Sequence, residues 1–205
     1  MKPLFVTGIG TDVGKTLISS VLVEKLKADY WKPIQSGDLD NSDTNKVRTL
    51  VSNSISYFHP EAYRLNHPFS PHKAADLDRI QIDPAKIIVP KTERALIIEG
   101  AGGLMVPLTS EFLIADLIIQ LSAEVILVSK NYLGSINHTL MTIELLRSRN
   151  IPLKGIVFNG DGDEYSEGVI RKYSEVSYFA HIPTLESISK KAVADLGIHF
   201  EGWDL

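Results

Sequence analysis

The chain has 205 residues, of which 44% are hydrophobic, carries a net charge of -4 at pH 7 and contains no cysteine. This composition supports one buried core, so we expect a single domain over residues 1–205, and the missing cysteines exclude disulfides, thiolate metal sites and cysteine nucleophiles. The acidic charge argues against a nucleic acid partner, and with no signal-peptide pattern and no apolar run of roughly 18 residues we expect a cytoplasmic protein without a membrane partner.

Short apolar runs alternate with segments of helical periodicity along the chain. This pattern predicts an α/β fold with a mostly parallel sheet and helices on both faces. The predicted strands are residues 4–6, 30–32, 95–98, 125–128, 155–158 and 177–182. The predicted helices are residues 15–28, 43–52, 111–122, 135–149, 165–174 and 187–196, with Ser42 and Ser110 as N-caps of the second and third.

Two segments depart from this simple alternation. Residues 54–91 contain several prolines and no clear period, so we expect a long irregular excursion over the ligand end of the sheet. In the predicted helix 135–149, Met141 and Leu145 make the apolar stripe wider than one sheet face requires. A dimer contact is one explanation of that width.

The first predicted strand runs into a glycine-rich turn that ends in Gly14, Lys15 and Thr16, the ending of a phosphate-binding loop (P-loop). Ile9 stands where the usual pattern has a glycine, but glycines flank it on both sides. Backbone N–H groups from Asp12 to Thr16 are expected around a β-phosphate, with Lys15 on the β- and γ-phosphates and the Thr16 hydroxyl on Mg²⁺. An ordinary turn between strand and helix does not require the lysine–threonine pair. The motif therefore predicts a P-loop NTPase-like fold that binds a nucleotide.

Two acidic residues are candidates for the same site. Glu99 ends a predicted strand and precedes a glycine cluster, where the backbone could pass close to a ligand. Asp43 opens a predicted helix after a polar loop. Each also has a purely structural interpretation, as a strand-end glutamate and as a helix-start residue. Together with Thr16 they would supply three oxygen ligands, which suits octahedral Mg²⁺.

Lys32 ends the short second strand and is expected to point into the crevice of the phosphate-binding loop. A fixed cation there would stabilise the negative charge that builds up during phosphoryl transfer. The alternative is a solvated strand-end lysine. Ser36 and Gly37 follow in a turn that could hydrogen-bond to an oxygen of a small substrate.

Taken together, these residues resemble the dethiobiotin synthase family. The resemblance covers nearly the whole chain in order, and outside the phosphate-binding loop it depends on the set and not on any one piece. It rests on residues 6–16, 32–37, 41–43, 70–72, 99–103 and 133–138 and on Asn159.

The resemblance implies an ATP- and Mg²⁺-dependent reaction of diaminopelargonate with CO₂. One amine captures CO₂ as a carbamate, the carbamate oxygen attacks the γ-phosphate, and the second amine closes the ring and expels phosphate. It also implies a homodimer in which the neighbouring subunit receives the substrate carboxylate.

The residues assigned by this resemblance fall into four groups. The catalytic residues are Lys15 and Lys32, and the metal ligands are Thr16, Asp43 and Glu99. The ATP-binding residues are Asp12, Val13, Gly14, Lys15, Thr16, Leu17, Asp43, Glu99, Gly100, Ala101, Gly102, Asn159, Gly160, Pro183, Thr184 and Leu185, of which Asn159 and the last three match the adenine-reading positions. The residues that bind the other substrate are Ser36, Gly134, Ser135, Ile136 and Asn137.

Three other functions share the predicted fold. Partitioning and septum-positioning ATPases generally carry a second lysine five residues before the P-loop lysine, where this chain has Gly10. Amide synthases of the cobyrinate type draw ammonia from a glutaminase domain with a cysteine nucleophile, which this chain lacks. A kinase for a small metabolite is the remaining alternative, although it has no evident need for residues 32–37.

Overall fold

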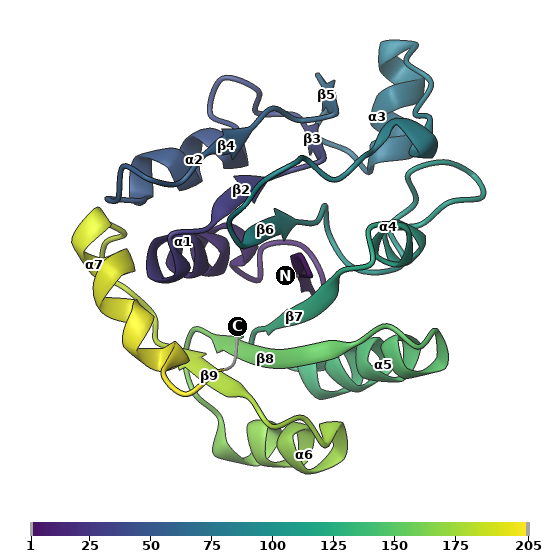
Figure 1. Ribbon diagram of the computed structural model, residues 1–205. Helices are drawn as coiled ribbons and strands as arrows, with labels where there is room; N and C mark the ends of the chain where they lie inside the picture. Colours follow the sequence, from purple (N-terminus) through teal and green to yellow (C-terminus); the bar gives the residue numbers. More distant parts are fainter. Residues whose placement is uncertain (1, 204–205) are drawn as a thin grey trace.

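The computed structural model describes residues 2–203. They form a seven-stranded sheet in the order β4-β2-β6-β1-β7-β8-β9, and each registered strand pair in it is parallel. A second, two-stranded sheet pairs β3 with β5. The prediction of an α/β fold with a mostly parallel sheet is confirmed (Figure 1).

The predicted strands and helices all have counterparts in the structure, with shifted ends. The strands are β1 Leu4–Gly8, β2 Asp29–Trp31, β3 Ile34–Ser36, β4 Phe58–His59, β5 Tyr63–Leu65, β6 Leu96–Glu99, β7 Glu124–Ser129, β8 Leu153–Asn159 and β9 Phe179–Ile182. The α-helices are α1 Lys15–Leu26, α2 Asp43–Leu50, α3 Pro71–Asp78, α4 Ile114–Gln120, α5 Ser135–Ser148, α6 Glu164–Ser174 and α7 Lys190–Asp195, and the 3-10 helices are η1 Pro84–Lys86 and η2 Leu196–Phe200. Within residues 2–203, none of these helices has the length and apolarity that crossing a membrane requires.

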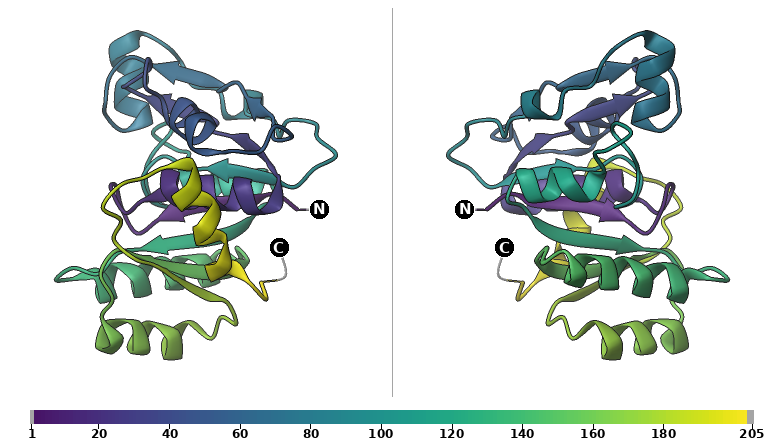
Figure 2. Two further views of the ribbon diagram at one scale, coloured as in Figure 1. Left: turned by 90° about the vertical axis from the view of Figure 1, so that its left-hand side faces the viewer. Right: turned by 90° about the vertical axis from the view of Figure 1, so that its right-hand side faces the viewer.

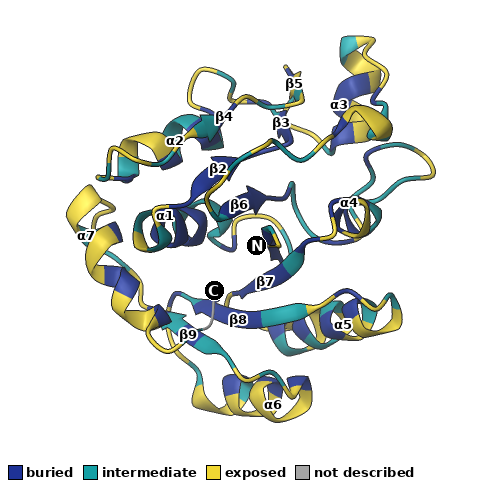
Figure 3. Cartoon of the chain, viewed as in Figure 1, coloured by how far each residue is buried: buried dark blue, intermediate teal, exposed yellow. Residues whose placement is uncertain are grey.

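The sheet separates two hydrophobic cores because neighbouring residues of a strand point to opposite faces. On one face, α1, α2 and α7 pack over Val6 and Ile97. On the other, α3, α4, α5 and α6 pack over Phe5 and Ile98. Figure 3 shows the buried strands between the two helical layers. The strand order places the carboxyl ends of β2, β6 and β1 side by side, so the residues that follow these strands can meet.

The N-cap prediction holds at Ser42 and is wrong at Ser110. The Ser42 side chain accepts a hydrogen bond from the backbone N–H of Asn45 at the start of α2. The third predicted helix begins only at Ile114, because the preceding loop is held by a bridge between Pro107 and Leu113. Its first turn is closed by Asp116, whose Oδ2 accepts from the backbone N–H of Leu113 at 2.8 Å.

The expectation of an irregular excursion over residues 54–91 is wrong in part, because the segment contains two strands and two short helices. β4 extends the main sheet beside β2, and β5 pairs with β3, a strand that the sequence pattern did not indicate. Figure 2 shows this part of the chain at the end of the molecule opposite to α6. Residues 68–71, which connect β5 to α3, line the cleft described below.

Candidate active site

The phosphate-binding loop joins β1 to α1 and is too tightly packed to admit a side chain at its last glycine. Gly14 has a φ of +99°, and a Cβ there would overlap the side-chain amide of Asn159. That amide donates from Nδ2 to the carbonyl oxygen of Val13 at 2.9 Å. The Lys15 ammonium donates to the carbonyl of Gly10 at 3.0 Å, and burial lowers the pKa of Lys15. The loop therefore has the close backbone packing that phosphate binding requires.

Glu99 lies at the end of β6, between β1 and β2, with 1% of its surface exposed. Its Oε1 accepts a hydrogen bond from the Thr16 hydroxyl at 2.9 Å, and its Oε2 accepts one from the Tyr30 hydroxyl at 2.9 Å. Burial and the negative charge of Glu99 raise the pKa of Tyr30, so the phenol keeps its proton and remains a donor. The carboxylate thus joins the first turn of α1 to the neighbouring strand β2.

Lys32 follows β2 directly and bridges the two predicted metal ligands. Its Nζ lies 2.6 Å from Oδ2 of Asp43 and 3.1 Å from Oε1 of Glu99. Burial alone would lower the pKa of Lys32, but the charges of Glu99 and Asp43 outweigh it and raise the pKa. Burial likewise opposes ionisation of Asp43, yet Lys32 holds the pKa of this carboxyl below its ordinary value. Lys32 is therefore a buried ammonium and no solvated strand-end lysine.

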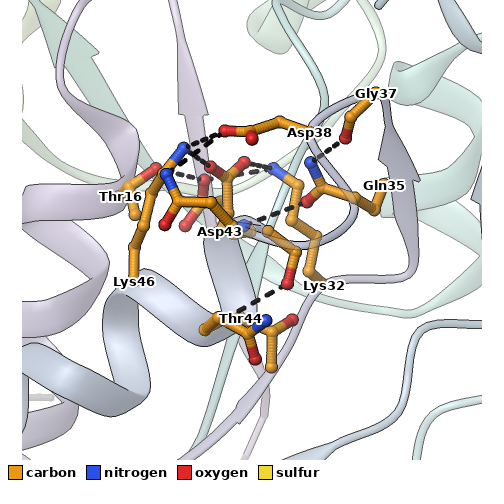
Figure 4. Close-up of polar contacts among 12 residues, drawn as sticks. Thr16, Lys32, Gln35, Gly37, Asp38, Asp43, Thr44 and Lys46 are labelled. Carbon is orange, nitrogen blue, oxygen red and sulfur yellow. Dashed lines mark hydrogen bonds and ion pairs between the residues drawn. The ribbon is translucent and has the colours of Figure 1, made fainter. Parts of the chain in front are cut away.

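The rim of the same cluster is formed by residues that the sequence analysis did not identify. Lys46 lies 2.9 Å from Oδ2 of Asp38 and 3.7 Å from Oδ1 of Asp43. Gln35 is buried; its Nε2 donates to the carbonyl of Gly37 at 2.9 Å and its Oε1 accepts from the backbone N–H of Asp43 at 3.2 Å. Figure 4 shows the ammonium groups of Lys32 and Lys46 both directed toward Asp43. The spacing of Lys46, three residues after Asp43 on a helix, was a usable signal, whereas nothing in the sequence marks Gln35.

A cleft of about 840 Å³ opens beside this cluster. The predicted site residues that line it are Asp12, Gly14, Lys15, Thr16, Lys32, Ser36, Asp43, Glu99, Gly100, Ala101 and Gly102. The predicted site residues that do not line it are Val13, Leu17, Gly134, Ser135, Ile136, Asn137, Asn159, Gly160, Pro183, Thr184 and Leu185. Ser36 Oγ is buried and has no hydrogen-bond partner within residues 2–203, so it is free to bind a ligand. A second hollow of about 600 Å³ lies between α3 and residues 108–110 and contains no predicted site residue.

The donor set of the cluster fits Mg²⁺. Thr16, Asp43 and Glu99 offer only oxygen atoms, the ligands that this hard cation prefers. The Lys32 ammonium between the two carboxylates shows that a positive charge is stable at this place. Residues 2–203 contain no group of three or more acidic, histidine or cysteine side chains that could hold a metal ion by themselves. A metal here would therefore complete its shell with water and phosphate oxygens, as Mg²⁺ does in nucleotide sites.

Comparison with known proteins shows to which family the chain belongs. A family model described as an AAA domain matches residues 2–192. An ATP-dependent dethiobiotin synthetase of Christiangramia forsetii is 55% identical over 181 residues, which are 88% of this chain and 87% of the relative. One of Cytophaga hutchinsonii is 49% identical over 205 residues and covers 99% of both chains. The chain belongs to the ATP-dependent dethiobiotin synthetase family. It is an enzyme, and the resemblance inferred from the motifs is confirmed.

Solved structures share the fold of this synthetase family member at low identity. The septum site-determining protein MinD from Pyrococcus horikoshii, complexed with Mg-ADP, has a TM-score of 0.61, 15% identity, and covers 98% of this chain and 97% of its own. A ParA family ATPase from Chlorobium tepidum has a TM-score of 0.59 and 15% identity, and the match covers 97% of this chain and 100% of the ATPase chain. These matches show the P-loop fold alone.

The positions that match the adenine site of the synthetase family lie at the ends of β8 and β9. Asn159 ends β8 and contacts the phosphate-binding loop through Val13. The Gly160 N–H donates to the carbonyl of Ile182 at 2.8 Å, and the Thr184 hydroxyl donates to Oδ1 of Asp161 at 2.7 Å. These contacts order the loops next to the phosphate-binding loop, and the adenine assignment stays a prediction.

The segment expected to receive the substrate carboxylate in this synthetase family begins α5. Gly134 is the N-cap with a φ of +104°, and Ser135 is buried. Neither lines the cleft of its own chain. Leu133 is fully exposed just before them, and Met141 on α5 is 62% exposed. Binding of this segment to a substrate across a dimer stays a prediction.

Proposed function

We propose that this enzyme converts diaminopelargonate, CO₂ and ATP into dethiobiotin, ADP and phosphate in a Mg²⁺-dependent reaction of biotin biosynthesis. The observation that carries the proposal is Lys32, buried between Asp43 and Glu99 beside the phosphate-binding loop. Family membership supports an ATP-dependent synthesis of dethiobiotin, and the cations and hydrogen-bond donors of the cleft would stabilise the negative charge that develops in such a reaction. As a C–N ligase it would act in the cytoplasm, as one domain over residues 1–205.

In this reaction one amine captures CO₂ and loses a proton to give a carbamate. A carbamate oxygen then forms a bond to the γ-phosphorus while the bond to the β–γ bridging oxygen breaks, and ADP leaves. The second amine attacks the carbonyl of the resulting mixed anhydride, loses its proton and expels phosphate. Each step places negative charge on oxygens around the transferred phosphoryl group, so fixed cations nearby would lower the barrier.

The residues of this chain would divide that task. Lys15 would neutralise the β- and γ-phosphates, and Lys32 would lie on the other side of the transferred group, against the carbamate. Ser36, whose buried hydroxyl has no partner within the described residues, would hydrogen-bond to the carbamate or amine end. Bound Mg²⁺, held by Thr16, Asp43 and Glu99, would supply the remaining charge neutralisation on the phosphate oxygens.

The far end of the substrate would bind outside the cleft of its own subunit. We propose a homodimer in which residues 134–137 receive the substrate carboxylate from the neighbouring subunit, since N–H groups at a helix start favour an anion. Leu133, just before α5, and Met141, on α5, are both exposed, which supports a contact with another subunit on this face. Asn159 and residues 183–185 would contact adenine.

The proposal is tested by phosphate release from ATP and Mg²⁺ in the presence of bicarbonate, with and without diaminopelargonate, combined with mass detection of dethiobiotin. We expect phosphate release that depends on the diamine and matches dethiobiotin formation one for one. Phosphate release indifferent to the diamine would contradict the proposal and favour an ATPase switch. Transfer of phosphate to the substrate without ring closure would indicate a kinase.

A further inference from the structure

Tyr30 is a fully buried tyrosine in the middle of β2, directed toward the cluster at the strand ends. Tyr30 pairs with Ile97 of β6, two residues before Glu99. Because alternate residues of a strand share a face, Tyr30, Ile97 and Glu99 all lie on the α1 side of the sheet. The Tyr30 side chain therefore reaches Glu99 diagonally along the neighbouring strand, and its hydroxyl donates to Oε2 at 2.9 Å.

The two oxygens of Glu99 have different surroundings. Oε1 accepts from the Thr16 hydroxyl at 2.9 Å and lies 3.1 Å from the Lys32 ammonium. Among residues 2–203, the hydrogen bond on Oε2 comes from Tyr30. The terminal torsion of a glutamate is broad and roughly two-fold, so a contact on the second oxygen narrows the rotation that contacts on the first one leave. With Oε2 held from the sheet side, Oε1 stays directed toward Thr16 and the cation position.

We propose that Tyr30 is a positioning residue that fixes the carboxylate of Glu99 for Mg²⁺ binding. Mutation of a partner that orients a ligating side chain typically lowers metal affinity or activity by about 10- to 100-fold. This inference rests on the proposed function, because that function is what brings Mg²⁺ to Thr16, Asp43 and Glu99. It extends the site by a residue that touches neither substrate nor metal.

The test compares Tyr30→Phe with the wild type in two calorimetric titrations, one of Mg²⁺ into the protein with ADP and one of ADP without Mg²⁺. Tyr30→Phe removes one oxygen atom and keeps the ring in its packing. We expect the Mg²⁺ affinity in the presence of ADP to fall by about 10-fold, at the lower end of the range for such partners. The affinity for ADP without Mg²⁺ should not change. In turnover, the Mg²⁺ concentration for half-maximal rate should rise while kcat at saturating Mg²⁺ stays within about two-fold.

A matched control is Tyr63→Phe. The Tyr63 hydroxyl is hydrogen-bonded too, donating to the carbonyl of Asp83 at 3.3 Å and accepting from the Asp83 N–H at 2.9 Å, but Tyr63 does not line the cleft. This variant should lose stability without any change in Mg²⁺ affinity. If Tyr30→Phe is too unstable for calorimetry, the additional rise in Tm that Mg²⁺ produces over ADP alone gives the same comparison.

The outcomes separate this proposal from the proposed function. Equal Mg²⁺ affinity of Tyr30→Phe and wild type would overturn the role of Tyr30, as would an equal loss of binding with and without Mg²⁺. A wild type whose ADP binding does not respond to Mg²⁺ would overturn it together with the metal site. A wild type that shows the Mg²⁺ response but forms no dethiobiotin would contradict the proposed reaction and leave the role of Tyr30 standing.

Discussion

The carboxyl ends of β1, β2 and β6 differ from those of β7, β8 and β9 in how their polar side chains find partners. At the first group, Thr16, Lys32, Asp43 and Glu99 come from four separate segments and bond to one another directly. At the second group, the contacts stay between the adjoining strand-end loops, as in the bond of Thr184 to Asp161. Asn159 links the two groups through Val13.

This difference shows which part of the site is organised in the chain alone. The buried ionic cluster has its charges paired in place, so electrostatic stabilisation needs little rearrangement when a nucleotide binds. The loops after β7, β8 and β9 present backbone groups and a helix start, which in the proposed function would bind a base and a carboxylate. Substitutions in the first group should therefore affect chemistry, and substitutions in the second should affect recognition.

The largest effect is expected for Lys32→Ala. Turnover of the diamine should fall by about 100- to 1000-fold, because a fixed cation next to the transferred group is lost. The variant should also lose about 3–5 kcal/mol of unfolding free energy without Mg²⁺, since two carboxylates then face each other without their buried partner. Phosphate release and thermal unfolding with and without Mg²⁺ measure both effects.

Lys15→Ala is the matched control, because Lys15 donates to the carbonyl of Gly10 and bridges no carboxylates. It should lower turnover to a similar extent, with a much smaller loss of stability than Lys32→Ala. Normal turnover of Lys32→Ala would remove its catalytic role and end the distinction between the two groups of strand ends.

A second large effect is expected at Gly14, where Asn159 at the end of β8 contacts the phosphate-binding loop that follows β1. Gly14→Ala places a Cβ against the Asn159 amide at a φ of +99°, so the loop must distort at a cost of about 1–3 kcal/mol. ADP affinity, measured by calorimetry with Mg²⁺, should fall by about 5- to 140-fold. Gly10→Ala is the control, because a Cβ there meets nothing within 4 Å. Equal losses in both variants would show that general loop rigidity matters and not the contact with Asn159.

Sequence patterns predicted the positions of residues best where those positions depend on local spacing. Lys15 and Thr16 follow a strand at a fixed distance, and Glu99 ends a strand, so all three could be placed without knowing the sheet order. Tyr30 could not be identified, because its contact with Glu99 exists only when β2 lies beside β6. The same reason hid the pairing of β3 with β5 inside a segment predicted to be irregular. The N-cap prediction at Ser110 was wrong because the bridge between Pro107 and Leu113 keeps these residues out of the helix, which begins at Ile114.

The other end of β2 provides a polar cluster of similar size without a predicted role in catalysis. Asp29 is buried and accepts hydrogen bonds from the Thr92 hydroxyl at 2.6 Å and the Tyr57 N–H at 2.9 Å, with Arg94 at 3.2 Å. Burial alone would raise the pKa of Asp29, but these partners lower it. A lowered pKa means that the charged form stabilises the fold above the ordinary pKa of about 3.9, and that this contribution is lost as the pH falls through the folded value.

Asp29→Asn should therefore cost about 1.5–3 kcal/mol of unfolding free energy at pH 7, and the difference from the wild type should shrink below about pH 4. Turnover at 25 °C should stay normal. Urea unfolding across this pH range measures the effect. The control is Asp195→Asn, which removes an exposed ion pair with Lys191 and should change the unfolding free energy little. If Asp29→Asn lost as much turnover as Lys32→Ala, activity would depend on any buried charge at either end of β2. The position of Lys32 at the cleft would then not be what matters.

The smallest effect is expected at the outer limit of the cluster, for Lys46→Met. The Lys46 side chain is 36% exposed, and its hydrogen bond to Asp38 is the main cause that raises the pKa of Lys46. Because solvent and salt screen such pairs, the substitution should cost less than about 1 kcal/mol, and 1 M NaCl should remove most of that difference. Turnover should change by no more than about three-fold, since Lys32 still holds Asp43 from the buried side. Lys191→Met on α7, which removes an exposed pair far from the cleft, is the matched control in both measurements. A salt-resistant loss of turnover in Lys46→Met alone would move the boundary of the catalytic cluster outward to include the loop that holds Asp38.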